Sequence, residues 1–372
     1  MKLLFSVCGI GLGHATRSYA ILKHLRGHFH RIKLVTYGDG VPFFEKFGEK
    51  PVDVKGYSYK GQFSFSVLYH VLEALRDPTK FPRFYENFKK VADEFKPDVI
   101  YADSDPNSVF YGSKRGIPVL NLTNLVTTVQ NFSKIPREYI TRDLNLQKLM
   151  VSRLVDYMVK NSEMTFVPSF ESRFRYIEGV KYTDLIVRKK PSELPSSSKL
   201  RSKLDLPEET YYVSIGGSDI ERHLFPVLRE ILPLFEDKFF VIASNYAVKK
   251  EIHEKNMRIL PFVDNVFEYI KASKGVIAPA GHSIISESIV FKKPMMVVPI
   301  INHIEQMVNA ALVYYEGFGQ ALFFKKGINK LLLKVSLSSF FQNIDEYNYN
   351  LKNIKLKGNG AEKIADYILK KY

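Results

Sequence analysis

The sequence is poor in cysteine and has no long apolar run. Its one cysteine, Cys8, excludes a framework of internal disulfides and fits a reducing cytoplasm. No stretch of about 18 apolar residues occurs, so we expect no transmembrane helix. Residues 2–8 are followed at once by glycine and histidine, which is unlike a secretory signal peptide. These absences favour a cytoplasmic protein and leave a peripheral contact with a membrane open.

Acidic residues are the minority among the charged ones. The chain has 54 Lys and Arg against 39 Asp and Glu, a formal net charge of +15. This charge implies anionic partners, but by itself it does not separate nucleic acid, acidic lipid and nucleotide phosphate. With 372 residues, 45% of them apolar, the chain is long enough for two domains with proper cores.

Both halves of the chain repeat one pattern, a short β-branched strand followed by a glycine turn and a helix. This alternation predicts two doubly wound α/β domains that face each other across a cleft. We expect an N-terminal domain over residues 1–188, a C-terminal domain over 189–358, and a last helix, 359–372, that crosses back. Residues 166–168 are predicted as the final strand of the first domain. The Ser-, Pro- and Lys-rich residues 189–206 are predicted as the passage between domains.

The stretch from Gly275 to Asn309 carries the strongest functional pattern. A buried strand over 275–278 leads through a tight turn into a helix over 283–291, and a second strand follows at 295–298. The start of a helix after a parallel strand favours a phosphate, because its free N–H groups and its dipole face the anion. Glu287, about one turn inside, can accept from two ribose hydroxyls. The polar residues beyond the second strand share one helix face and would meet the sugar.

The spacing within this stretch resembles the donor-binding motif of inverting glycosyltransferases with the GT-B fold. The similar families are family 1, the UDP-glycosyltransferases, and family 28, which contains the bacterial N-acetylglucosaminyltransferase of peptidoglycan lipid synthesis. The resemblance implies a UDP-linked sugar donor and a hydroxyl acceptor such as a lipid-linked sugar or a glycan. We expect no metal or other cofactor, because a helix start with a glycine loop can hold the diphosphate and no Asp-x-Asp motif lies at the donor site. The residues that carry the resemblance are Gly281, Glu287, Pro294, Glu305, Gln306 and Asn309.

Two departures from related patterns are informative. The histidine that contacts the phosphate in family 1 falls at Pro279, whereas this chain has His282 directly after Gly281. Retaining GT-B enzymes carry a pair of glutamates with seven residues between them, and here Pro279 and Met295 occupy the two positions at that separation from Glu287. We therefore expect inversion rather than retention.

His14 stands at the mouth of the first helix, after a glycine-rich turn. This is the position at which the families that it resembles carry their general base. The resemblance also implies that Asp103, at the end of a later strand, pairs with the base. Such a carboxylate fixes the imidazole tautomer and stabilises the imidazolium formed in reaction. Asp105 is an alternative partner, and both aspartates could instead cap the helix that follows.

A second strand, glycine turn and helix, at 211–221, predicts another phosphate-binding loop. Phe262 and Val263 resemble the family 28 segment that holds the uracil ring. The predicted catalytic residues are His14 and Asp103. The predicted donor-binding residues are Gly11, Gly13, Gly216, Gly217, Ser218, Phe262, Val263, Gly281, His282, Ser283, Glu287, Glu305, Gln306 and Asn309.

Residues 57–96 interleave aromatic and basic side chains. One interpretation is a helical insertion packed on the core with its charges in water. Another is an acceptor surface on anionic lipid, and nucleic-acid binding ranks below both. The alternative functions are a nucleotide-sugar epimerase of the same fold, a non-catalytic protein that binds a membrane surface or nucleic acid, and an inactive scaffold subunit.

Overall fold

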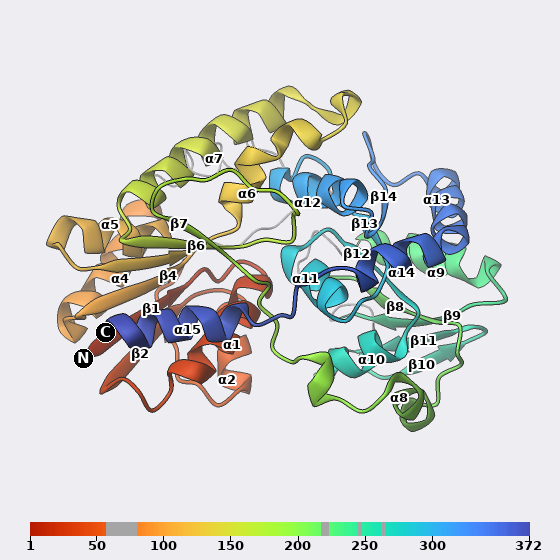
Figure 1. Ribbon diagram of the computed structural model, residues 1–372, viewed down its shortest axis with the longest axis horizontal. Helices are drawn as coiled ribbons and strands as arrows, with labels where there is room; N and C mark the ends of the chain where they lie inside the picture. The colour runs from red at the N-terminus through yellow and green to blue at the C-terminus, as the bar shows by residue number, and fades with distance from the viewer. Residues whose placement is uncertain (57–79, 217–222, 245–247, 262, 264) are drawn as a thin grey trace.

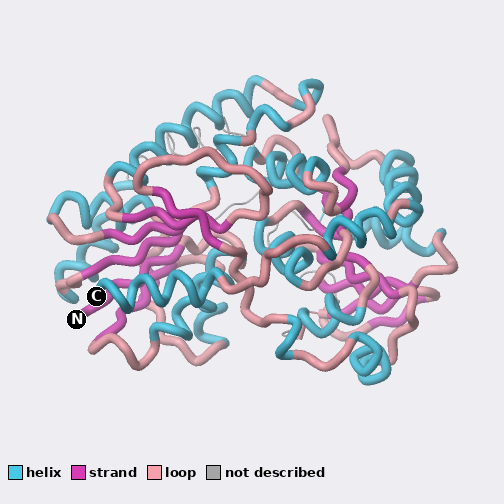
Figure 2. The backbone as a smooth tube through the Cα atoms, in the orientation of Figure 1, coloured by secondary structure: helices cyan, strands magenta, loops and turns pink. Residues whose placement is uncertain are grey.

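The computed structural model describes residues 1–56, 80–216, 223–244, 248–261, 263 and 265–372. These residues form two α/β units, each built on a seven-stranded sheet (Figures 1 and 2). The predicted fold class, two doubly wound domains, is thereby confirmed. The bounds of the domains stay a prediction.

The first sheet is parallel throughout and has the order β3-β2-β1-β4-β5-β6-β7. The order reverses between β1 and β4, where helices leave to opposite faces. Its strands are β1 (Lys2–Val7), β2 (Arg31–Thr36), β3 (Val52–Asp53), β4 (Val99–Asp103), β5 (Val119–Leu122), β6 (Met164–Pro168) and β7 (Val180–Thr183). The helices of this unit are α1 (Gly13–Leu25), α2 (Gly40–Lys46), α4 (Lys80–Phe95), α5 (Pro106–Arg115), α6 (Leu125–Gln130) and α7 (Arg142–Lys160).

The second sheet has the order β10-β11-β9-β8-β12-β13-β14, and only the β10–β11 pair is antiparallel among the described strands. Here the order reverses between β8 and β12. The strands are β8 (Thr210–Ser214), β9 (Phe239–Ala243), β10 (Ile252–Glu254), β11 (Met257–Leu260), β12 (Gly275–Pro279), β13 (Met295–Val298) and β14 (Gly319–Ala321). The helices are α8 (Ser197–Leu204), α9 (Leu224–Ile231), α10 (Val266–Ala272), α11 (His282–Val290), α12 (Ile304–Tyr315), α13 (Lys330–Gln342), α14 (Ile344–Lys352) and α15 (Gly360–Lys371).

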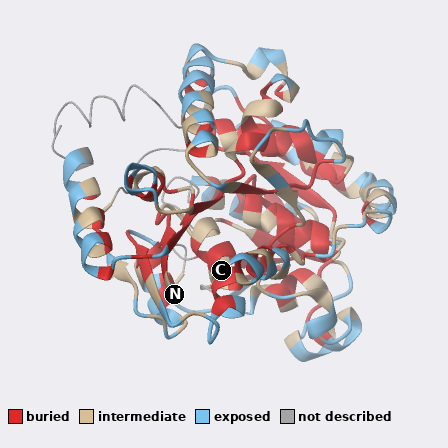
Figure 3. Ribbon diagram, turned by 60° about the vertical axis from the view of Figure 1, so that its left-hand side comes forward, coloured by how far each residue is buried: buried red, intermediate tan, exposed pale blue. Residues whose placement is uncertain are grey.

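Continuous apolar runs form the central strands because helices cover both faces of each sheet. Every residue of β4, β12 and β13 is buried, and both sheets lie in the interior in Figure 3. Pro294 precedes β13 and Pro299 follows it, and because proline cannot donate a hydrogen bond to a neighbouring strand, both favour the ends of β13.

The last helix, α15, returns to the first unit and packs along α1 (Figure 1). Its apolar face, which includes Ile364 and Ile368, is buried with Leu3 and Phe5 of β1. The C-terminal residues therefore complete the core around the strand that leads to His14.

Two local predictions need correction, and one strand was not expected. The predicted passage, 189–206, contains α8, which packs on α10, and its Leu200 is fully buried in the core of the second unit. Burial of one apolar face outweighs the Ser- and Pro-rich composition. Residues 166–168 are not the final strand of the first sheet, because β7 pairs with β6 beyond them. The strand β10 was also not predicted, since it is a short, exposed edge strand without an apolar pattern.

The two units share an apolar core. Residues of the first unit, among them Phe132, Leu144 and Phe170, belong to the same buried cluster as α12 and α11. Gln147 on α7 donates to the carbonyl of Asn302 (2.6 Å) and accepts from the N–H of Ile304 (3.2 Å). The start of α12 is therefore fixed against the first unit.

The basic and aromatic stretch, 57–96, is described only from residue 80 onward. In α4, Phe84 and Phe88 are buried and lie edge-on to Tyr37 and Tyr111. The described part of the stretch therefore matches the interpretation of a helix packed on the core. Residues 57–79 lie outside the described residues. No helix in the described part of the chain combines the length and the apolar character that a bilayer crossing needs.

Candidate active site

The predicted catalytic pair lies at the point where the strand order of the first sheet reverses. β1 and β4 are neighbours in register, with Val7 opposite Asp103, and α1 begins after β1. Crevices at such points are where open α/β sheets bind ligands. His14, the second residue of α1, places Nδ1 2.9 Å from Asp103 Oδ1. An ionised carboxylate only accepts, so this bond requires a proton on Nδ1 and leaves Nε2 as an acceptor.

Asp103 is fully buried, yet it is ionised. Burial by itself would raise its pKa, but the charges of Arg17 and His14 and their hydrogen bonds lower the pKa of Asp103 well below its ordinary value. Arg17 Nε donates to Oδ2 (2.8 Å) and Arg17 NH2 to Oδ1. Ser18 Oγ also donates to Oδ2 (2.6 Å). Both carboxylate oxygens are thus fully engaged.

Arg17 was not predicted. It follows His14 by three residues, so the two side chains share one face of α1. This spacing was the available signal, but nothing local tells a buried arginine from an exposed one.

Asp105, the alternative partner, has another role. It is the N-cap of α5, where its side chain accepts from the N–H of Asn107 (3.1 Å) and from Ser6 Oγ (2.6 Å). Burial raises the pKa of this carboxyl. The geometry thus selects Asp103 as the partner of His14.

The first turn of α11 faces the first turn of α1. Ser283 Oγ donates to the carbonyl of Gly13 (3.3 Å), and the two helices are in contact. Neither helix has a side-chain cap, so the N–H groups of both first turns are not used by a capping residue. A Cβ added at Gly281 would meet no atom within 4 Å, so a ligand can approach this backbone closely. Gly11, with a φ of +65°, donates its N–H to Asp39 (3.0 Å).

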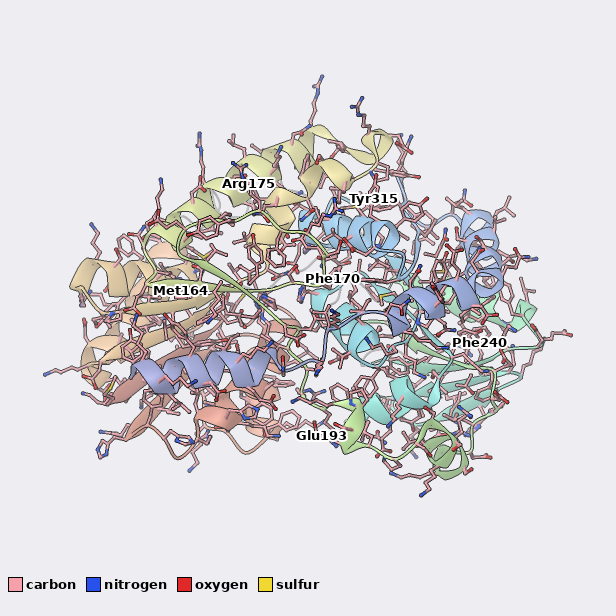
Figure 4. All side chains as sticks on the ribbon, in the orientation of Figure 1. Met164, Phe170, Arg175, Glu193, Phe240 and Tyr315 are labelled. Carbon is pink, nitrogen blue, oxygen red and sulfur yellow. The ribbon has the colours of Figure 1, made fainter. Side chains whose placement is uncertain are left out.

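The imidazole of His282 is already engaged. It is buried, with Nε2 3.1 Å from the carbonyl of Pro168 and Nδ1 3.3 Å from Ser286 Oγ. Burial, together with the charge of Arg17, lowers the pKa of His282 to about 4, so the ring is neutral. Nε2 therefore donates to Pro168, across the boundary of the two units, and only the backbone of His282 is available to a phosphate. In Figure 4 Phe170, whose ring centre is 5.7 Å from that of His282, lies where the two units meet.

Glu287 is a buried carboxyl without a hydrogen-bond donor among the described residues. Burial raises its pKa to about 7, and only the charge of Arg188 opposes this rise. A carboxyl group in this state is energetically costly unless something else in the site donates to it.

Arg188 is a second ionisable residue here with a buried polar atom that lacks a hydrogen-bond partner among the described residues, and its charge lowers the pKa of Glu287. Its Nε is buried and has no hydrogen-bond partner in the described part of the chain. Its guanidinium lies over the rings of Phe267 (5.0 Å) and Phe47 (5.5 Å), one from each unit. No sequence pattern pointed to Arg188, because it lies in an irregular segment between β7 and α8.

Glu305 links the two units. It accepts from Asn124 Nδ2 (2.8 Å), and Asn124 Oδ1 in turn accepts from Arg17 NH1 (3.1 Å). Burial tends to raise the pKa of Glu305, but the charge of His303 and the bond from Asn124 lower it below its ordinary value. A continuous chain of hydrogen bonds therefore joins Glu305 to Asp103 and His14. Asn124 was also missed by the sequence patterns.

The side chains of Gln306 and Asn309 form hydrogen bonds with backbone groups. Gln306 Oε1 accepts from the N–H of Ile300 (3.0 Å), and Asn309 Nδ2 donates to the carbonyl of Ala280 (3.0 Å). These bonds fix the loop after β13 and the turn between β12 and α11. The predicted contact of both residues with the sugar stays a prediction, since each of these bonds uses only one polar atom of the amide group.

The second glycine loop is only partly described. Gly216 follows β8 with a φ of +82°, at the point where the second sheet reverses its order. Val263 packs against the apolar core. Gly217, Ser218 and Phe262 lie outside the described residues.

Comparison with known proteins identifies the family. A family model described as glycosyl transferase family 1 matches residues 1–177 and 220–342. The chain belongs to glycosyl transferase family 1. Its activity is therefore that of a glycosyltransferase.

Named relatives of this glycosyltransferase fall into two groups. An uncharacterized glycosyltransferase of Methanosarcina acetivorans is 28% identical, over 87% of this chain and 86% of its own. A UDP-N-acetylglucosamine–N-acetylmuramyl-(pentapeptide) pyrophosphoryl-undecaprenol N-acetylglucosamine transferase of Clostridium botulinum is 24% identical, over 100% of this chain and 99% of its own. The predicted resemblance to families 1 and 28 is confirmed.

Solved glycosyltransferases share the fold. The spinosyn rhamnosyltransferase SpnG, complexed with thymidine diphosphate, superposes with a TM-score of 0.69 at 10% identity over 99% of this chain and 100% of its own. The calicheamicin glycosyltransferase CalG4 gives 0.64 at 15% identity, over 98% and 97% of the two chains. These structures show the GT-B fold of this glycosyltransferase.

Proposed function

We propose that this glycosyltransferase transfers a sugar, with inversion, from a nucleoside diphosphate sugar to a hydroxyl acceptor, with His14 as general base. The observation that carries the proposal is the bond of 2.9 Å between His14 and the buried, ionised Asp103, beside the uncapped first turn of α11. In the reaction, His14 Nε2 takes the proton of the acceptor hydroxyl, the oxygen attacks the anomeric carbon, and the bond to the diphosphate breaks.

The leaving diphosphate would be met by backbone N–H groups. The first turns of α1 and α11 face each other and lack side-chain caps. One helix end contributes only about 0.3–1 kcal/mol when exposed, so both ends and the loop at Gly216 would have to act together.

The buried carboxyl of Glu287 favours a nucleotide whose ribose carries two free hydroxyl groups. Its carboxyl lacks donors in the described part of the chain, and two ribose hydroxyls would supply them. The name of the Clostridium relative supports UDP as the nucleotide. The SpnG structure was solved with thymidine diphosphate, which makes this nucleotide the competitor to test.

The first experiment is a binding panel. Calorimetry with UDP, thymidine diphosphate, ADP and GDP should select one nucleotide, and its sugars should then be screened with hydroxyl acceptors, lipid-linked ones included. Inversion predicts a β-linked product from an α-linked donor, which NMR of the product decides. Binding of none of these nucleotides would refute the proposal.

The decisive variant is His14→Ala. We expect it to bind the nucleotide as the wild type does and to lose about 10²–10⁴ of the transfer rate. His24→Ala, an exposed histidine at the end of the same helix, is the matched control and should transfer normally. Full turnover by His14→Ala would disprove the assignment of the base.

Independence of metal is proposed together with this chemistry. Nowhere in the described ranges do three or more His, Cys, Asp or Glu side chains gather in a way that could hold a metal ion. We expect the transfer rate to be unchanged by EDTA. A loss of activity that Mg²⁺ or Mn²⁺ restores would contradict this expectation.

The epimerase alternative is tested in the same assays. An epimerase would convert the nucleotide sugar to its C2 epimer without any acceptor. We expect no such conversion, because the His14–Asp103 pair suits removal of a proton from a hydroxyl.

A further inference from the structure

Arg17 is a buried arginine in contact with the proposed base and with its partner. It is 5% exposed, donates two hydrogen bonds to Asp103, and donates to Asn124 Oδ1 (3.1 Å) and Ser104 Oγ (3.3 Å). Its NH2 group also lies 3.0 Å from His14 Nδ1. The proposed transfer of the acceptor's proton to His14 does not by itself explain why the positive charge of Arg17 lies beside the base.

The contact between Arg17 and His14 is not a good hydrogen bond while His14 donates to Asp103. Guanidinium nitrogens only donate, and His14 Nδ1 then carries its own proton. Two donors thus face each other at 3.0 Å, while Asp103 Oδ1 lies 2.9 Å from the same nitrogen. A positive and a negative charge act on the same imidazole from nearly equal distances.

Asp103 is in turn held by the arginine. The bidentate fork from Arg17 uses both oxygens, which orients the carboxylate and neutralises its charge. Asp103 can still fix the tautomer of His14, but its power to attract a second proton onto the ring is reduced.

We propose that Arg17 is a positioning residue that orients Asp103 and offsets its attraction for a proton on His14, so that the imidazole stays neutral and able to accept. This inference rests on the proposed function. During transfer, the proton of the acceptor hydroxyl moves to His14 Nε2, and the electron pair of the anomeric bond leaves with the diphosphate. The imidazolium must then release that proton to solvent before the next turnover, and the charge of Arg17 favours the release.

Other charged groups also face His14. Glu305 reaches it from α12 and His282 from α11, and both interact with it electrostatically. His282 is neutral, so its contribution is small, and Glu305 adds to the attraction of Asp103. Arg17 is a cation in direct contact with the ring, with its NH2 group 3.0 Å from Nδ1.

The test is a titration of His14 by NMR, with ring-labelled histidine and with His14→Gln to assign the signal. In Arg17→Met the pH at which His14 titrates should rise by at least about one unit, because Asp103 then acts alone. Asp103→Asn should lower the pH at which His14 titrates. In Arg17→Lys, which keeps the charge, it should shift by less than about half a unit.

Arg17→Met leaves Asp103 buried without its main counter-charge, which can prevent folding. The double variant Arg17→Met/Asp103→Asn removes both charges and should titrate as the wild type does. An unchanged titration in Arg17→Met, an equal shift in Arg17→Lys, or a double variant that titrates like Asp103→Asn would overturn the inference.

Transfer assays separate this inference from the proposed function. The acid limb of the pH–rate profile should move upward in Arg17→Met by the amount seen in the titration. The titration itself needs no substrate, so a shift without any transfer activity would refute only the proposed function. Transfer activity without a shift would refute only the role of Arg17.

Discussion

Replacement of Glu287 by glutamine is expected to stabilise the free protein at alkaline pH and to weaken its binding of nucleotide. Burial raises the pKa of this carboxyl from 4.5 to about 7, and Arg188 opposes only part of the rise. Between these values the folded protein holds a proton that the unfolded chain has released. The free energy of unfolding therefore falls as the pH rises through this window.

The size of the effect follows from the pKa. A rise of 2.5 units (7 − 4.5) corresponds to about 3.4 kcal/mol, which the wild type has lost once the pH is above 7. In Glu287→Gln the side chain does not ionise. Its advantage over the wild type should grow by about 2.5 kcal/mol from pH 5 to pH 8. The cost of burying an unpaired amide is the same at both pH values and cancels in this comparison.

Thermal unfolding measures this difference. If the whole chain unfolds in one transition, the gap in Tm between variant and wild type should widen by about 3 °C from pH 5 to pH 8. Glu346→Gln, an exposed glutamate on α14, is the matched control and should show no such change. Parallel curves for wild type and Glu287→Gln between pH 5 and pH 8 would refute the reasoning.

The same variant should bind nucleotide more weakly. Ribose hydroxyls donate to an ionised carboxylate, and a charge-assisted hydrogen bond contributes about 1.5–3 kcal/mol. Glu287→Gln should therefore lose about 10- to 100-fold in affinity at pH 8. Wild-type affinity should also fall as the pH drops below 7, because the protonated carboxyl loses the negative charge that strengthens its bonds with the ribose hydroxyls. Equal affinities of variant and wild type at pH 8 would show that Glu287 does not contact the ribose.

Three further predictions concern the same site. Arg188→Met should raise the pKa of Glu287 further and weaken nucleotide binding at pH 7 by about tenfold, with recovery at pH 9, since the higher pH restores the ionised form; calorimetry at both pH values checks this, and a loss that is equal at both would contradict it. Gly281→Val should fold with a stability within about 0.5 kcal/mol of the wild type, because its side chain meets open space, yet fail to bind nucleotide, as thermal shift with and without UDP would show. Asn309→Ala should lower stability by about 1 kcal/mol through loss of the bond to Ala280 and weaken nucleotide binding only in part, whereas complete loss of binding would favour a direct contact.

Much of the fold was accessible from local patterns. Apolar runs bounded by glycine and proline predicted β12 and β13 almost to the residue, and the glycine turn before His14 predicted α1. These patterns depend on neighbouring residues and on burial between helices, so a sequence expresses them directly. Edge strands such as β10 and β7 lack this pattern and were missed. The helix α8 was not predicted from its Ser-, Pro- and Lys-rich composition, since only its packing on α10 makes it stable.

The sequence by itself determined the two doubly wound units, the spacing of Gly281, Glu287 and Glu305, and the position of His14 at a helix mouth. Only the tertiary structure decided how these groups are used. It paired His14 with Asp103 across 89 positions and joined Asn124 to Glu305 across 181. It also engaged the ring of His282 with Pro168 and turned Asn309 to the backbone. Such contacts depend on the packing of elements that are distant in the chain, because a buried polar group bonds to whichever partner the fold brings within reach.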